Sequence, residues 1–450
     1  MNKFRFLSAL FLLLALAAHA APPNIVILLA DDLGHGDLSS YGAPEIRTPH
    51  IDSIGKNGVR FTRFYSNSPE CTPSRTALLT GRHPQRVGGL ECAIGVGNVG
   101  RYDEAIWLQQ RGELGLPATE ASLAPACKRA GYATALFGKW HLGYESKFSP
   151  RQHGFDEALY VLGGAIDYIT HKEDNGDDVL RHNGEPVTVA GHLTDIIADR
   201  ALAWLKERGD APYLLYLPFT APHFPYQLPG DPAVTGSWSK GTKDTYRGMI
   251  EHMDRRIGEI LRAIAASPRA RDTIVVFLSD NGGTAMGSNQ PFRGHKTTMW
   301  EGGIHVPCLV QWPAVIRAGT ELTLPVQTID LTATLLAAAA VSPSATRPLD
   351  GESFLGVWRG QAAPRARPLY WRYQRETNRR KAILDGEYKL VIDNGARELI
   401  HLAKDPQERT NLLASLPEKA AALEAKLAAW EREVRAPRLR EFYAQPASAK

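Results

Sequence analysis

Five stretches of the chain are apolar for nearly their whole length and end in polar or turn-forming residues. Runs of this kind are typical of strands buried on both faces of a sheet, and they cover residues 23–32, 132–140, 212–223, 273–283 and 306–313. Between them, apolar side chains recur with the helical period over residues 194–208, which begin at a Thr194 cap, and over residues 244–264 and 328–340. Strands that alternate with helices predict an α/β fold with a mostly parallel sheet and helices on both faces.

The C-terminal part of the chain has a different pattern. Residues 368–374, 381–393 and 396–402 have the composition of short strands, and Asp385-Gly386 is a typical hairpin turn within the second of them. An Ala-rich segment, residues 417–434, favours a closing helix. We therefore expect a larger domain at residues 21–360 and a smaller antiparallel α+β subdomain at residues 361–450.

The first twenty residues have the pattern of an export signal. Lys3 and Arg5 precede an uncharged apolar run over residues 6–18, and a small-x-small cleavage site follows at residues 18–20. A membrane anchor is the alternative, but the run is shorter than the roughly 20 apolar residues that a span needs, and two prolines follow at once. We expect residues 1–20 to be a signal peptide and the mature chain to be exported, periplasmic or secreted, without a membrane span.

Composition and charge exclude several classes of protein. The chain has 450 residues, of which 44% are hydrophobic and 22% charged, and it is too apolar for a disordered protein. Its formal net charge of +4 gives the whole molecule no strong attraction to nucleic acid. Four cysteines are too few for a disulfide framework. Cys92 and Cys127 could form a disulfide or be free thiols. Cys308, in an apolar run, is expected to be a buried thiol.

Polar side chains gather at the carboxyl ends of four of the five predicted strands. Because sites in open α/β sheets form at this edge, we expect a single pocket there. The side chains concerned are Asp31, Asp32, Lys139, His141, His223, Asp280 and Asn281. The carboxylates and the amide offer only oxygen ligands, which suit a hard cation, Ca²⁺ first and Mg²⁺ second. The alternative is that they are turn residues, but Asp31-Asp32 and Asp280-Asn281 both directly follow apolar strands.

Residues 71–81 form the most informative segment. Pro73 is accepted in a first helical turn, so we expect a short helix over residues 74–79 with Cys71 just before its positive end. A cysteine at such a position indicates either a thiolate nucleophile or a small buried or disulfide-bonded side chain. Position alone leaves both interpretations open.

The string Cys71-x-Pro73-Ser74-Arg75, followed by Leu-Thr-Gly, resembles the signature of formylglycine-dependent type I sulfatases of the arylsulfatase and glycosaminoglycan-sulfatase kind. The resemblance extends over nearly the whole mature chain, through the blocks NIVILLADDLGHGDLSSYG, FGKWHLG, PHFP, LSDNGG and HKTTMWEGG in family order. It implies an alkaline-phosphatase-like α/β fold with a mixed sheet, and hydrolysis of an organic sulfate ester. It also implies a maturation enzyme that oxidises Cys71 to formylglycine.

A hydrated aldehyde suits this chemistry, because one hydroxyl can attack sulfur and the other can collapse to C=O and expel sulfate from a covalent sulfo-enzyme intermediate. The resemblance implies a nucleophile and metal ligand derived from Cys71, with the further metal ligands Asp31, Asp32, Asp280 and Asn281. It implies that Arg75 and Lys139 hold the hydrate and that His141 is the base. It implies that Lys296 and His223 contact the sulfate, with His223 as the proton donor to the leaving alcohol.

Several alternatives stay open. Phosphonate monoester and phosphodiester hydrolases share this fold, and a non-catalytic protein that binds sulfated glycans would need an unmodified Cys71. The expected substrate is a sulfated small molecule or glycan. Arginines and aromatic residues interleave at residues 365–381, which indicates either a solvated charged face or a contact surface for a polyanionic, ring-stacking substrate. By resemblance, Asp167 and Tyr168 are weaker candidates for substrate contact.

Overall fold

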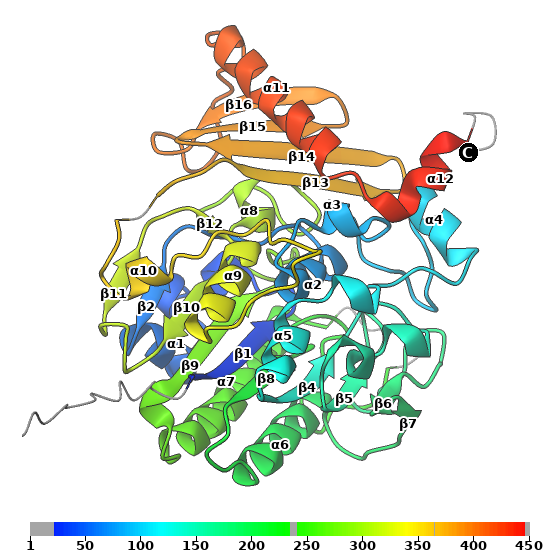
Figure 1. Ribbon diagram of the computed structural model, residues 1–450, viewed down its shortest axis with the longest axis vertical. Coiled ribbons are helices and arrows are strands. Elements are labelled where there is room, and N and C mark those ends of the chain that lie inside the picture. Colours follow the sequence, from blue (N-terminus) through cyan, green and yellow to red (C-terminus); the bar gives the residue numbers. More distant parts are fainter. Residues whose placement is uncertain (1–21, 235–240, 364, 446–450) are drawn as a thin grey trace, which may run out of the picture.

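The computed structural model describes residues 22–234, 241–363 and 365–445, so the predicted signal peptide, residues 1–20, lies outside the described residues. A ten-stranded sheet crosses the larger part of the molecule (Figure 1). In spatial order its strands are β11 (Thr320–Leu322), β2 (Val59–Phe61), β10 (Cys308–Gln311), β9 (Thr273–Ser279), β1 (Asn24–Ala30), β8 (Tyr213–Pro218), β4 (Ala133–Lys139), β5 (Glu157–Val161), β6 (Leu180–His182) and β7 (Glu185–Pro186).

The central strands β9, β1, β8, β4 and β5 run parallel, whereas β10 and β6 are antiparallel to their neighbours. The sheet is therefore mixed and mostly parallel, and the predicted fold class is confirmed. Each of the five apolar runs contains one of its strands, and β1, β8 and β9 are buried along their whole length. This burial explains why their sequences are continuously apolar instead of alternating.

Helices cover both faces of the sheet. On one face pack α1 (Pro49–Lys56), α6 (Leu193–Lys206) and α7 (Lys243–Ala265), and on the other α2 (Cys71–Thr80), α5 (Leu123–Arg129) and α9 (Thr328–Ala338). Shorter helices are α3 (Pro84–Val87), α4 (Asp103–Gln109), α8 (Glu301–Ile304) and α10 (Leu355–Trp358). The predicted Thr194 cap of α6 is wrong, because the side chain of His192 accepts the Thr194 N–H. In the described part of the chain, no helix combines the length and apolarity that a bilayer crossing requires.

A second, antiparallel sheet lies beside the first and carries one long helix on its outer face (Figure 1). Its strands are β13 (Leu369–Arg375), β14 (Asn378–Asp385), β15 (Tyr388–Asp393) and β16 (Ala396–His401), and its helix is α11 (Pro417–Glu433). The predicted hairpin is present: Asp385 pairs with Tyr388, and the turn is made by Gly386, with a φ of +63°, and Glu387. A pair of short strands, β3 (Phe64–Tyr65) and β12 (Val326–Gln327), and α12 (Arg440–Ala444) complete the fold. The domain boundary near residue 360 stays a prediction.

All four cysteines are buried and free. The alternative of a Cys92–Cys127 disulfide is therefore wrong, and the expectation of a buried thiol at Cys308 is confirmed. Cys92, Cys127 and Cys308 lie in the hydrophobic core, where apolar neighbours suit a small, weakly polar side chain, whereas Cys71 lies at the site edge of the sheet.

Candidate active site

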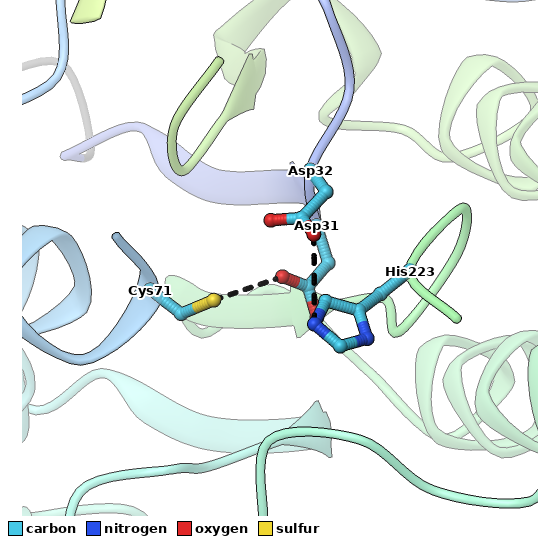
Figure 2. Close-up of side chains that lie close together, drawn as sticks. All are labelled: Asp31, Asp32, Cys71 and His223. Carbon is cyan, nitrogen blue, oxygen red and sulfur yellow. Dashed lines mark hydrogen bonds and ion pairs between the residues drawn. The ribbon is translucent and has the colours of Figure 1, made fainter. Parts of the chain in front are cut away.

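The predicted strand-end side chains meet at one edge of the large sheet. Asp31 and Asp32 follow β1, Asp280 follows the neighbouring strand β9, and His223 lies in the loop after β8 on the other side. Because these strands are parallel, their carboxyl ends share one edge. Figure 2 shows Asp31, Asp32, Cys71 and His223 converging, and their ligand atoms all lie within 4.8 Å of one another.

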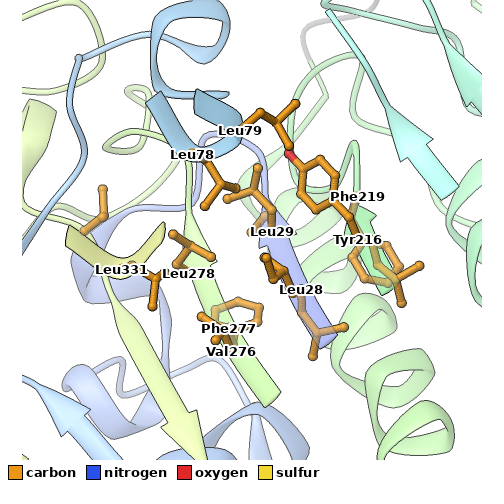
Figure 3. Packing of buried hydrophobic residues seen from close by; sticks show 14 of the residues in the cluster. Leu28, Leu29, Leu78, Leu79, Tyr216, Phe219, Val276, Phe277, Leu278 and Leu331 are labelled. Carbon is orange, nitrogen blue, oxygen red and sulfur yellow. The ribbon is translucent and has the colours of Figure 1, made fainter. Parts of the chain in front are cut away.

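Helix α2 carries Cys71 and is buried along its whole length. Figure 3 shows its Leu78 and Leu79 in the hydrophobic core beside Leu29 of β1. The helix ends at Thr80, and the φ of +65° at the following Gly81 lets its N–H reach the carbonyl of Ala77 (2.8 Å). Its predicted start is wrong. The helix begins at Cys71, with Glu70 as its N-cap, so the thiol stands on the first residue at the positive end of the helix dipole.

The thiol of Cys71 lies among buried charges. Its Sγ is 3.3 Å from Oδ1 of Asp31, whose Oδ2 accepts a hydrogen bond from Lys139 Nζ (2.5 Å). Burial, and after it the charge of Asp31, raises the pKa of the Cys71 thiol well above its ordinary value. The unmodified side chain is therefore a neutral thiol at physiological pH and a poor nucleophile.

Arg75 lies one turn after Cys71 and is completely buried. Its Nε and Nη2 donate to Oδ2 of Asp280 (3.0 and 2.8 Å), and its Nη1 donates to the backbone carbonyl of Lys139 (3.0 Å). One guanidinium thus joins α2 to the ends of β9 and β4. These contacts fix the position of α2, and with it Cys71, relative to Asp280.

On the opposite side, Lys296 and His223 face Asp32. Lys296 Nζ lies 2.8 Å from Asp32 Oδ2 and 3.3 Å from His223 Nε2. His223 Nδ1 is 2.6 Å from the Phe224 carbonyl, which can only accept, so the ring proton is on Nδ1. Burial, opposed by Asp32 and reinforced by Lys296, lowers the pKa of His223 to about 3. Against the effect of burial, Lys296 and then His223 lower the pKa of Asp32 to about 2.

His141 is a second buried, neutral histidine at this edge. Burial and then the charge of Lys139 lower its pKa well below the ordinary value. Its Nε2 lies 2.8 Å from the carbonyl of Ile94 and therefore carries the proton. Its buried Nδ1 has no hydrogen-bond partner among the described residues. A neutral imidazole with a free lone pair is the form that a general base requires.

The acidic edge fits a hard cation. Asn281 Nδ2 donates to Asp32 (2.8 Å) and to the Gly282 carbonyl (3.0 Å), and its buried Oδ1 is left without a partner in the part of the chain that the structure describes. This oxygen and the carboxylates of Asp31, Asp32 and Asp280 form a donor set of oxygen atoms only. The charges of Arg75, Lys139 and Lys296 already balance the three carboxylates, so a divalent ion would leave a positive surplus for an anionic substrate.

Three arginines of the Arg-rich segment form ion pairs within the molecule, whereas Arg365 and Arg379 are exposed. Arg367 pairs with Asp330 (2.5 Å), Arg372 with Glu91 (2.6 Å) and Arg375 with Glu70 (2.7 Å). Trp371 and Tyr373 are buried and offer no face for ring stacking. The interpretation as a substrate-contact surface is therefore wrong for these residues, and so is that of a solvated face. They attach β13 to the larger part of the molecule.

Asp167 and Tyr168 are buried and act inside the fold. Asp167 Oδ1 accepts the N–H groups of Ile169 and Thr170 (2.9 and 3.0 Å), and the Tyr168 hydroxyl donates to the backbone carbonyl of His223 (2.9 Å). The expectation that they contact substrate is not borne out by this placement. Sequence reasoning missed Phe224, which is 38% exposed and stacks on the His223 ring with centroids 4.4 Å apart.

Comparison with known proteins agrees with this geometry. Residues 23–341 match the family described as Sulfatase, and residues 293–435 match the family described as N-sulphoglucosamine sulphohydrolase, C-terminal. Steryl-sulfatase of Mus musculus is 32% identical over 425 residues, covering 76% of this chain and 66% of that protein. N-acetylgalactosamine-6-sulfatase of Homo sapiens is 34% identical over 352 residues, covering 74% of this chain and 65% of that protein.

The chain thus spans just under two thirds of the length of these two curated relatives. Among solved structures, that of Ps i-CgsB in complex with k-i-k-neocarrahexaose superposes with a TM-score of 0.80 at 27% identity, covering 91% of this chain and 93% of the other. The Sulfatase match includes all the strand-end side chains and Cys71. On these grounds the chain belongs to the sulfatase family.

Proposed function

We propose that this protein hydrolyses organic sulfate esters, releasing an alcohol and inorganic sulfate, and that its substrate is a sulfated saccharide. The observation that carries the proposal is the buried cluster in which Cys71, at the positive end of α2, lies 3.3 Å from Asp31, with Lys296 and His223 beside Asp32. Cationic side chains at this edge suit the sulfuryl oxygens, and family membership supports the same reaction. Export through the N-terminal signal is part of the proposal.

The protonated, buried state of the Cys71 thiol supports its conversion to formylglycine, because the thiol itself is a weak nucleophile there. The hydrated aldehyde would supply one hydroxyl for attack on sulfur and a second hydroxyl through which the aldehyde reforms when sulfate leaves. Asp31, Asp32, Asp280 and Asn281 would hold a calcium ion, with magnesium as the second choice, which would neutralise charge on the sulfuryl oxygens.

The remaining polar side chains have separate tasks in this proposal. Lys139 and Arg75 orient the carboxylates around residue 71 and keep their charges balanced. His141 takes a proton at Nδ1, its free lone pair. Lys296 and His223 face the leaving oxygen, and the 3.3 Å contact between Nζ and Nε2 lets a proton pass from this pair to the departing alcohol.

The comparisons support a saccharide. One relative is named for a sulfated amino sugar and one similar structure was solved with neocarrahexaose. Another relative is named for a steroid substrate, so the substrate class is decided by assay.

The test is a paired assay of the purified, matured protein. We expect sulfate release from para-nitrophenyl sulfate and from members of a panel of sulfated sugars, with kcat/KM at least about 100-fold above that for para-nitrophenyl phosphate. Faster hydrolysis of phosphate diesters or phosphonate esters would favour the phosphonate monoester or phosphodiester hydrolase. Tight binding of sulfated glycans without any turnover, with Cys71 unmodified, would favour a binding protein.

The role of His223 gives a second prediction. In His223→Asn, kcat/KM should fall by about 100-fold or more on a sugar sulfate, whose alkoxide needs a proton. The loss on para-nitrophenyl sulfate should be under about tenfold, because nitrophenolate leaves without protonation. Leaving-group series measured on both proteins would show this as a steeper dependence in the variant. Equal losses on both substrates would contradict proton donation.

A further inference from the structure

We propose that the C-terminal subdomain positions the catalytic base. Two partly buried ion pairs from β13 hold residues 91–94, and the carbonyl of Ile94 in that segment orients the imidazole of His141. The inference rests on the proposed function in one respect only, which is that His141 acts as the base. It gives the arginines of β13 a function other than contact with substrate.

The two ion pairs reach the segment from one strand. Arg372 Nε and Nη2 donate to the two carboxylate oxygens of Glu91 (2.7 and 2.6 Å), and Arg375 Nη1 donates to Oε1 of Glu70 (2.7 Å). Both glutamates are buried. Paired and two-pronged contacts of this kind fix direction as well as distance. A buried carboxylate that loses its arginine must either move toward water or take up a proton.

Hydrogen bonds connect residues 91–94 to His141. The second oxygen of Glu70, Oε2, accepts the N–H of Ala93 (2.8 Å). The next residue, Ile94, donates its N–H to Thr72 Oγ1 (3.2 Å) and accepts from His141 Nε2 (2.8 Å). Thr72 Oγ1 in turn donates to the backbone carbonyl of His141 (3.0 Å). The first turn of α2, residues 91–94 and His141 therefore form one hydrogen-bonded unit that β13 holds from outside.

The position of the Ile94 carbonyl decides what His141 can do. A carbonyl only accepts, so it keeps the proton on Nε2 and leaves the Nδ1 lone pair free. The ring has no room to move away, because a Cβ on Gly164 would lie 2.5 Å from His141 Cε1. If residues 91–94 shift, the ring loses its partner and its defined tautomer. Arg372 and Arg375 are thus positioning residues that act through this segment.

The experiment compares Arg372→Gln and Arg375→Gln with the control Arg367→Gln. The control also removes an ion pair of the C-terminal subdomain, but that pair joins Arg367 to Asp330 and not to Glu70 or Glu91. We expect kcat on para-nitrophenyl sulfate to fall by about 10–100-fold in the first two variants, with KM within about twofold. Arg367→Gln should keep kcat near the wild-type value. Arg375→Lys, which retains the charge, should recover a large part of the loss.

A second readout does not depend on activity. Amide hydrogen exchange of residues 91–94 should be faster in Arg372→Gln and Arg375→Gln but not in Arg367→Gln, in protein with Cys71 still unmodified as well as in matured protein. Nitrogen NMR of the imidazoles should show the Nε2-protonated form of His141 in the wild type and a tautomer mixture in the two variants. Unchanged exchange and tautomer in both would overturn the inference, as would an equal fall of kcat in Arg367→Gln.

Gly164→Ala tests the other side of the ring. The added methyl group displaces His141 without touching β13, so kcat should fall by about 100-fold while exchange at residues 91–94 stays as in the wild type. Gly209→Ala is the control, because a Cβ at Gly209 meets no atom within 4 Å. If the wild type hydrolyses no sulfate ester, the proposed function fails, whereas the exchange and NMR results still decide whether β13 positions His141.

Discussion

Cys71→Ala is expected to abolish turnover of every sulfate ester, lowering kcat by a factor of about 10,000 or more. The variant removes the thiol that maturation would replace by the aldehyde, and the cluster around Asp31 contains no second cysteine among the described residues. Initial rates with para-nitrophenyl sulfate and with the best sugar sulfate measure the loss. The fold should survive, since the thiol donates only one hydrogen bond, at 3.3 Å to Asp31.

Matched variants separate this effect from a general loss of thiols. Cys127→Ala and Cys308→Ala remove thiols that are equally buried but lie in the packed core, and both should keep kcat near the wild-type value. Cys71→Ser should be as inactive as Cys71→Ala when the protein is produced in a host that oxidises only cysteine. Peptide mass spectrometry of fully active wild type that shows an intact thiol at position 71 would falsify the formylglycine proposal.

Removal of the divalent cation is expected to cost nearly all activity, and calcium is expected to restore it. Without the ion, Arg75, Lys139 and Lys296 only balance the charges of Asp31, Asp32 and Asp280, so no positive surplus remains for the sulfuryl group. Dialysis against a chelator followed by addition of Ca²⁺, Mg²⁺ or Zn²⁺ measures this as recovered kcat/KM. Thermal unfolding should shift upward with Ca²⁺, because a bound ligand stabilises the folded state.

Asn281→Ala sharpens the same test, because it removes the one buried ligand oxygen that has no partner in the described chain. The Ca²⁺ concentration for half-maximal activity should rise by about tenfold or more. Asn289→Ala, in the same region but bonded only to backbone groups of Gly283 and Gly294, should leave this concentration unchanged. Restoration by Zn²⁺ but not by Ca²⁺ would instead indicate ligation by His223 and the residue 71 side chain.

The central strands and the acidic edge follow from the sequence by itself. Continuous apolar runs such as β1 and β9 can only be buried, and polar residues at their ends can only lie at the edge of the sheet, so Asp31, Asp32 and Asp280 had to meet. Local rules were less reliable at helix ends. The start of α2 at Cys71 and the His192 cap of α6 depend on backbone geometry that residue preferences do not specify.

Only the tertiary structure decided what the arginines of β13 do. Glu70 precedes Arg375 by 305 residues and Glu91 precedes Arg372 by 281 residues, and no local pattern couples charges that far apart. The same holds for His141, whose tautomer is set by a carbonyl 47 residues earlier in the chain. The hydrophobic pattern of a sequence predicts which residues are buried, because the polarity of a side chain is a property of that residue alone. Pairing and protonation depend on which groups the folded chain brings together, and they arise only once folding has removed water from between them.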